Sequence, residues 1–185
     1  MKRICTCLLC LILVLAAVTS FSSCSIYGQR RVADPSYMAA RQDVLTAPRP
    51  TESKDFFFYT AIVDIDAGDH VRTLVCHFDG TTELHLSTGE VYAGLEVYDP
   101  AIVGMTQDFL KGLSQNTDYI YWQDKTSLAL PRTGCHSIYA AGTQGIYHLS
   151  LNPQKIPATP VSEIYGLYML LYEAVTALVV ENTSP

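Results

Sequence analysis

The spacing of hydrophobic and polar residues changes along this chain, and each change marks an expected structural element. Residues 1–24 are mostly apolar after two basic residues, and residues 25–55 are mostly polar and contain three prolines. From residue 56 onward, β-branched and aromatic residues dominate, and turn-forming residues recur at hairpin spacing. This pattern predicts strands at 56–66, 70–78, 82–86 and 90–97.

The second expected hairpin has a definite register. Its loop is Asp79-Gly80-Thr81, so Leu74 pairs with Leu86. By the same register Cys76 pairs with Leu84 and points inward. The opposite face is expected to be wetter and carries Val75, His77, Glu83 and His85.

Two longer segments have helical spacing. Asp99-Pro100 combines a capping residue with a first-turn proline and precedes a predicted helix at 100–113. Thr159-Pro160 starts a second helix that runs to about Glu181. Short strands are also expected near 119–123, 126–130, 136–140 and 146–151. Because strands and helices do not alternate as parallel units, the fold class is α+β: a mainly antiparallel sheet with an internal amphipathic helix and a long apolar C-terminal helix packed on one face.

The expected C-terminal helix is apolar over more than one face. Its core-facing stripe keeps helical spacing and consists of Ile164, Leu167, Tyr168, Leu171, Val175 and Leu178. Tyr165, Met169 and Tyr172 extend the apolar surface beyond that stripe. We expect this second side to be available, at least in part, to a protein partner or a second copy. Crossing of a bilayer is disfavoured because Glu173 would lie at mid-span.

The N-terminus resembles the signal of a bacterial lipoprotein. Lys2 and Arg3 precede an apolar stretch, and Phe21-Ser22-Ser23-Cys24 is similar to the lipobox that precedes an acylated cysteine. The resemblance implies that residues 1–23 are a signal peptide, that Cys24 carries the lipid, palmitate included, and that Ser25 directs the protein to the outer membrane. The alternative is ordinary secretion with cleavage after Ser22.

The mature chain is divided by composition into two parts. Residues 24–55 comprise the lipidated cysteine and a flexible tether, in which Asp34-Pro35 could open a short helix through Leu45. Residues 56–185 form a single α+β domain. Loss of Lys2 and Arg3 leaves 10 basic residues against 18 acidic ones, a net charge of −8. An acidic surface without a basic cluster repels phosphate backbones, so nucleic acid is excluded as a partner.

Two cysteines, Cys76 and Cys135, remain in the mature domain. In an oxidising compartment they could form a disulfide, and two buried free thiols are the alternative. A third hypothesis is an envelope cysteine hydrolase that uses Cys135 with His148 or His136 as the base. Adjacent strand residues point to opposite faces, which argues against Cys135 reaching His136.

Other motifs add little chemistry. Residues 130–134, LPRTG, are similar to a sortase signal but lie within the predicted domain, where Pro131 and Gly134 indicate a turn. The chain shows no spacing typical of a structural zinc site and no phosphate-binding loop, and we expect no cofactor, metal site or catalytic residues. The sequence therefore predicts a lipid-anchored cell-envelope protein with a non-catalytic binding or scaffolding domain, attached to the membrane by its lipid and available to an envelope partner or to self-association.

Overall fold

The computed structural model describes residues 33–54, 57–118, 123–124, 128–156 and 160–183. The chain from Ala33 onward forms one compact unit. Within it, one seven-stranded sheet has the order β4-β3-β2-β1-β6-β7-β5. Every pairing is antiparallel. The strands are β1 Phe58–Asp66, β2 Val71–His77, β3 Thr82–Leu86, β4 Val91–Tyr92, β5 Gln123–Asp124, β6 His136–Gly142 and β7 Gly145–Leu151.

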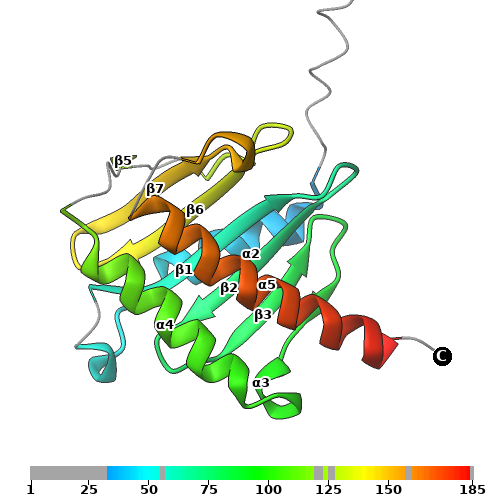
Figure 1. Ribbon diagram of the computed structural model, residues 1–185, viewed down its shortest axis with the longest axis horizontal. Helices are drawn as coiled ribbons and strands as arrows, with labels where there is room; N and C mark the ends of the chain where they lie inside the picture. Colours follow the sequence, from blue (N-terminus) through cyan, green and yellow to red (C-terminus); the bar gives the residue numbers. More distant parts are fainter. Residues whose placement is uncertain (1–32, 55–56, 119–122, 125–127, 157–159, 184–185) are drawn as a thin grey trace, which may run out of the picture. The chain divides into compact units, whose positions relative to one another are not determined.

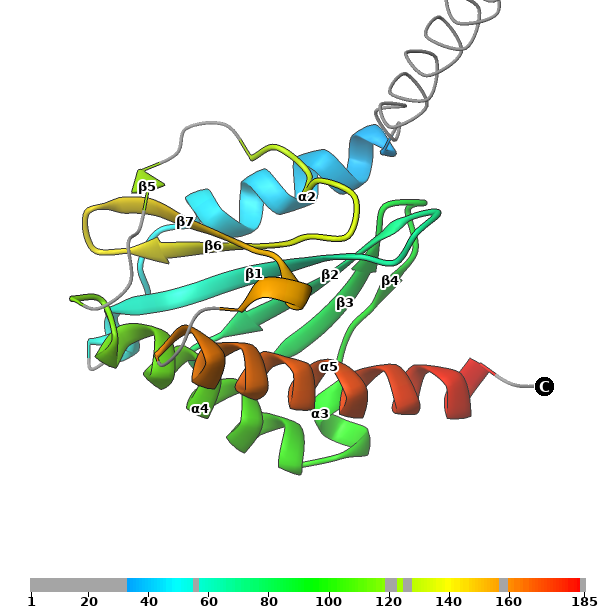
Figure 2. The same ribbon diagram turned by 45° about the horizontal axis from the view of Figure 1, so that its top comes forward.

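Helices cover both faces of this sheet. Two long helices, α4 (Ala101–Gln115) and α5 (Val161–Thr183), lie on one face, and α2 (Pro35–Thr46) lies on the other (Figures 1 and 2). Short helical turns complete the described elements: α3 Leu95–Tyr98, η2 Thr51–Ser53 and η3 Pro153–Lys155. The predicted α+β class is confirmed, including the internal helix and the long C-terminal helix packed on one face. The sheet is the middle of three layers.

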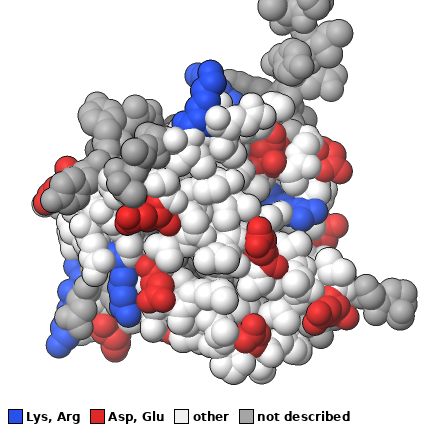
Figure 3. Space-filling view, in the orientation of Figure 1, with Lys and Arg blue, Asp and Glu red and all other residues white. Residues whose placement is uncertain are grey.

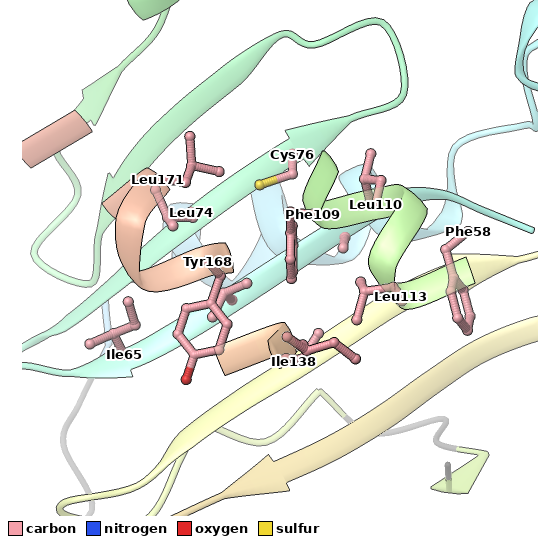
Figure 4. Packing of buried hydrophobic residues seen from close by; sticks show 14 of the residues in the cluster. Phe58, Ile65, Leu74, Cys76, Phe109, Leu110, Leu113, Ile138, Tyr168 and Leu171 are labelled. Carbon is pink, nitrogen blue, oxygen red and sulfur yellow. The ribbon is translucent and has the colours of Figure 1, made fainter. Parts of the chain in front are cut away.

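The main core lies between the sheet and the helices α4 and α5. Alternate residues of β1, β2 and β6 point toward these helices, as the two-residue period of a strand requires (Figure 4). Apolar residues at helical spacing on α4 and α5 face them. The fully buried members include Phe58, Leu74, Phe109, Leu110, Leu113, Ile138, Ile164, Tyr168, Leu171 and Val175. The predicted core stripe of the C-terminal helix therefore lies on the protein's own sheet.

A second, smaller core lies beneath α2. Asp34 caps this helix by accepting the Ser36 N–H at 2.7 Å, and Pro35 occupies its first turn. Tyr37 and Leu45 of the helix are buried against the sheet. The expected tether of residues 24–55 is thus too long at its C-terminal end, because the compact unit begins at Ala33. The short helix predicted to start at Asp34-Pro35 is α2, and it is part of the fold.

The β2–β3 register differs from the prediction by two residues. Leu74 pairs with Leu84, and Cys76 pairs with Thr82. Gly80 closes the loop at φ 93°, where an added Cβ would lie 2.5 Å from a methyl carbon of Val103 on α4. A shift of two residues preserves the face of every side chain, so Cys76 is fully buried as expected.

Three other predictions need correction. The strand predicted at 90–97 ends at Tyr92, because Gly94 adopts φ 71° and α3 begins immediately after it. The face expected to be wetter is partly covered by α2, so Val75 is fully buried and His85 is only 4% exposed. Near 119–130 the described strand is Gln123–Asp124, residues 128–130 form no strand, and the rest of those two predicted strands lies outside the described residues. The predicted strands at 136–140 and 146–151 and both longer helices are confirmed.

Candidate functional site

The two cysteines of the domain are both free thiols. Cys76 and Ala140 are the two neighbours of Ala61 across the sheet. His136, the residue next to Cys135, lies four residues along β6 from Ala140, which is about 13 Å. A disulfide requires Cα atoms within about 7 Å. The disulfide between Cys76 and Cys135 was therefore a wrong prediction, because the strand register holds the two residues apart.

The proposed hydrolase residues also lie apart. His148 pairs with Tyr139 and stacks on its ring at 4.5 Å, three residues and about 10 Å along β6 from His136. His136 points to the helix side, where its Nδ1 lies 2.8 Å from the hydroxyl of Tyr168. Burial lowers the pKa of His136. Cys135 thus has neither histidine placed as a base, which removes the geometric support for a Cys135 nucleophile.

The polar residues of β3 form a pair. His85 Nε2 lies 2.6 Å from a carboxylate oxygen of Glu83. His77 lies on β2, two residues beyond Val75, the partner of Glu83, and its Nδ1 is 3.3 Å from Thr60 Oγ1. Among the residues that the structure describes, no group of three or more His, Cys, Asp or Glu side chains is placed to hold a metal ion. The Glu83–His85 pair lacks the third ligand that protein zinc sites use.

The most polar buried cluster joins α2 to the sheet. Arg41 and Asp64 form an ion pair in which both side chains are fully buried. Arg41 Nε donates to Asp64 at 3.2 Å, and Arg41 Nη1 donates to the carbonyl of Leu128 at 2.8 Å. Thr73 donates to the same carboxylate at 2.6 Å, and the Tyr37 hydroxyl lies 2.6 Å from the hydroxyl of Thr73.

Aromatic rings and burial shape the electrostatics of this cluster. The guanidinium of Arg41 lies over the rings of Tyr37 and Tyr139, 5.6 and 5.7 Å from their centroids. Burial and the charge of Asp64 raise the pKa of Tyr139 to about 12 and also raise that of Tyr37. Burial alone would lower the pKa of Arg41, but Asp64 raises it. The charges of Arg41 and Asp64 are thus enclosed and mutually satisfied, which suits a structural clamp better than a binding site.

Helix α5 carries the surface for which a partner was predicted. Within the described residues it is the helix that is long and apolar enough to cross a membrane by length and composition, and its core stripe lies on the sheet. Tyr165, Met169 and Tyr172 are each half-buried. Tyr165 stacks on His136 with ring centroids 6.1 Å apart, and the hydroxyl of Tyr172 accepts from Arg72 at 3.0 Å. All three predicted partner residues also pack against the core, so each has intramolecular contacts, and their role in binding stays a prediction.

A groove lies beside the C-terminal half of α5. Its volume is about 460 Å³, and it is open to solvent. The side chains that line it come from β2 and from one side of α5: Arg72, Tyr172, Glu173, Thr176, Ala177, Val180 and Glu181. Tyr172 is the residue that this groove shares with the predicted partner surface.

The groove combines charge of both signs with an apolar wall. Arg72 is the basic residue of its lining, and Glu173 and Glu181 are both exposed acids. Ala177 and Val180 supply the apolar wall, and Val180 is 57% exposed. The face of the molecule that carries α4 and α5 is mostly uncharged, with isolated acidic side chains across it and basic side chains nearer its edges (Figure 3). The groove is a candidate functional site because it is a shallow surface, open to solvent, with polar groups accessible to a ligand.

Of the residues that line this groove, the partner surface predicted from the sequence includes Tyr172 but not Arg72. Arg72 was missed, although it interrupts an apolar strand on the face of Leu74 and Cys76, where a charge needs either a partner or solvent. Comparison with known proteins gives no match, either with a protein-family model, with a curated protein or with a solved structure.

Proposed function

We propose that this chain is a lipid-anchored protein of the cell envelope whose domain acts by binding or scaffolding and not by catalysis. The observation that carries the proposal is the N-terminal sequence, in which a basic start and an apolar stretch precede Phe21-Ser22-Ser23-Cys24. Ser25 favours the outer membrane as the destination. The acidic balance of the mature chain supports a partner other than nucleic acid.

The domain's part in this proposal is to bind or scaffold an envelope component. The groove beside α5 offers both charges and an apolar wall, and the half-buried side of α5 offers Tyr165 and Met169 to a protein partner or a second copy. The separation of Cys135 from His148 favours binding over the hydrolase alternative. A binding domain held by a lipid needs no catalytic group of its own.

The test of the anchor is a Cys24→Ala variant expressed with its native signal. We expect it to leave the membrane fraction or to accumulate unprocessed, whereas the wild type should stay in the membrane fraction with an acylated N-terminal cysteine detectable by mass spectrometry. Cys135→Ala is the matched control, because it removes a cysteine outside the signal and should fractionate like the wild type. A wild-type protein that is soluble after export, with Ser23 at its N-terminus, would refute the proposal.

A further inference from the structure

The groove beside α5 lies near the point where the folded domain begins. The N–H of Asp34 donates to the carbonyl of Ser87 at 3.0 Å, and the N–H of Ser87 donates to the carbonyl of Val71 at 2.9 Å. Val71 directly precedes Arg72, which lines the groove. Since hydrogen-bonded backbones place Cα atoms about 5 Å apart and consecutive Cα atoms are about 4 Å apart, Asp34 and Arg72 are within about 15 Å. The start of α2 and the C-terminal end of α5 lie toward the same end of the domain (Figure 2).

This position matters if Cys24 carries a lipid, so the inference rests on the proposed function. Only residues 25–32 separate Cys24 from the compact unit that begins at Ala33. A chain of that length reaches about 30 Å when fully extended, and its root-mean-square span as a flexible chain is about 16 Å. The anchor therefore keeps the groove within reach of the lipid headgroups.

The charges of the groove match a headgroup that carries both signs. Arg72 Nη1 donates to the Tyr172 hydroxyl at 3.0 Å, and Arg72 Nε donates to His70 Nε2 at 3.1 Å. Its third nitrogen, Nη2, has no hydrogen-bond partner among the described residues and is left for an anion. Glu173 supplies a carboxylate for a cation next to Tyr172, and Glu181 lies about 12 Å further along the same helix. Charge-assisted hydrogen bonds of both kinds would then form in one groove.

We propose that this groove binds the zwitterionic headgroup of an aminophospholipid in the membrane that holds the anchor. The phosphate lies at Arg72, the ammonium lies at Glu173, the neighbour of Tyr172 on α5, and the glycerol end lies against Ala177 and Val180. A headgroup without the ammonium would bring its negative charge close to the carboxylate of Glu173. A quaternary ammonium has no N–H to donate to it. The groove thus favours phosphatidylethanolamine over phosphatidylglycerol and phosphatidylcholine.

The experiment uses the soluble mature chain carrying Cys24→Ala, so that binding to the groove is separated from anchoring. Short-chain dihexanoyl phosphatidylethanolamine is added below its micelle concentration, and backbone amide shifts are followed by NMR. We expect saturable shifts at Arg72 and along the groove side of α5, with much weaker binding of the matching phosphatidylglycerol and phosphatidylcholine. Arg72→Gln and Glu173→Gln should each weaken binding about tenfold, the loss typical of one charge-assisted hydrogen bond.

Glu163→Gln is the matched control, because Glu163 is an exposed acid of the same helix outside the groove. It should bind like the parent chain. Glu173 is also exposed, so its variant keeps the test valid even if Arg72→Gln perturbs the fold. Equal binding of the three lipids, shifts that avoid the groove, or equally tight binding of free phosphoethanolamine would each overturn the proposal. Because these chains lack the anchor, such a result leaves the Cys24 fractionation experiment unaffected.

Discussion

Replacing Asp64 by Asn should destabilise the fold strongly, because it leaves the charge of Arg41 buried without its counter-ion. Asp64 accepts hydrogen bonds from both Arg41 and Thr73, and the side chains of Arg41 and Asp64 have no exposed surface. Removing one partner of a buried ion pair costs about 3–5 kcal/mol. Domains of this size are stable by about 5–15 kcal/mol, so the substitution should remove a large share of the free energy of unfolding.

The assay is urea denaturation of the soluble mature chain, followed by circular dichroism. Asp43→Asn is the matched control, since Asp43 is an exposed residue of α2, the helix that carries Arg41. Its replacement should change the free energy of unfolding by no more than about 0.5 kcal/mol. The double variant Arg41→Met with Asp64→Leu should recover most of the loss, because an apolar pair of similar volume carries no desolvation penalty. If Asp64→Asn is no more harmful than Asp43→Asn, the pair is not buried and the packing of α2 described above is wrong.

Three further predictions concern other parts of the domain. In the soluble chain lacking Cys24, iodoacetamide should label Cys135 but not Cys76, because Cys76 is buried and burial raises its pKa. Adding a reductant should not change the labelling. Labelling that depends on the reductant would contradict the conclusion that both cysteines are free thiols. Because burial lowers the pKa of His136, the unfolded chain binds its proton more readily, so stability should fall as pH drops below about 6.5. Urea midpoints at about pH 7.5 and about pH 5.5 should therefore differ less for His136→Gln than for the wild type; an equal difference would exclude His136 as the cause. Gly80→Ala should cost about 3 kcal/mol, because it combines a positive φ with a clash on α4, whereas Gly68→Ala, with a similar φ and open space, should cost about 1 kcal/mol; equal losses in thermal denaturation would contradict the close approach of α4.

The parts of the fold that the sequence predicted are those where one periodic pattern dominates. The two-residue period placed Cys76 on the buried face even though the pairing partner was two residues off, because such a shift leaves faces unchanged. The helical period of α5 identified Ile164, Tyr168 and Val175 as core residues, and all three are fully buried. Local periodicity carries this information without any knowledge of distant contacts.

The docking of α2 could not be predicted in the same way. The buried residues of α2 include Arg41. A charged side chain in a polar segment is expected to face solvent unless its ion-pair partner is known. That partner is Asp64, which lies in the apolar strand β1. A carboxylate within such a strand was the available signal, because it requires a hydrogen-bonding or charged partner when buried.

If Cys24 carries the lipid that we propose, the ion pair on α2 and the groove beside α5 are connected through the length of chain between Cys24 and the fold. With α2 held on the sheet, residues 25–32 separate Cys24 from the fold; with α2 released, the spacer would extend to about residue 54. Because the span of a flexible chain grows with the square root of its length, release would roughly double the distance over which the domain moves from its lipid. The buried pair of Arg41 and Asp64 adds little net stability relative to an apolar pair. Its hydrogen bonds, however, form in only one position of α2 on the sheet. We therefore propose that its contribution is to fix where the chain leaves the domain and, in a lipid-anchored protein, how close Arg72 and the groove stay to the membrane surface.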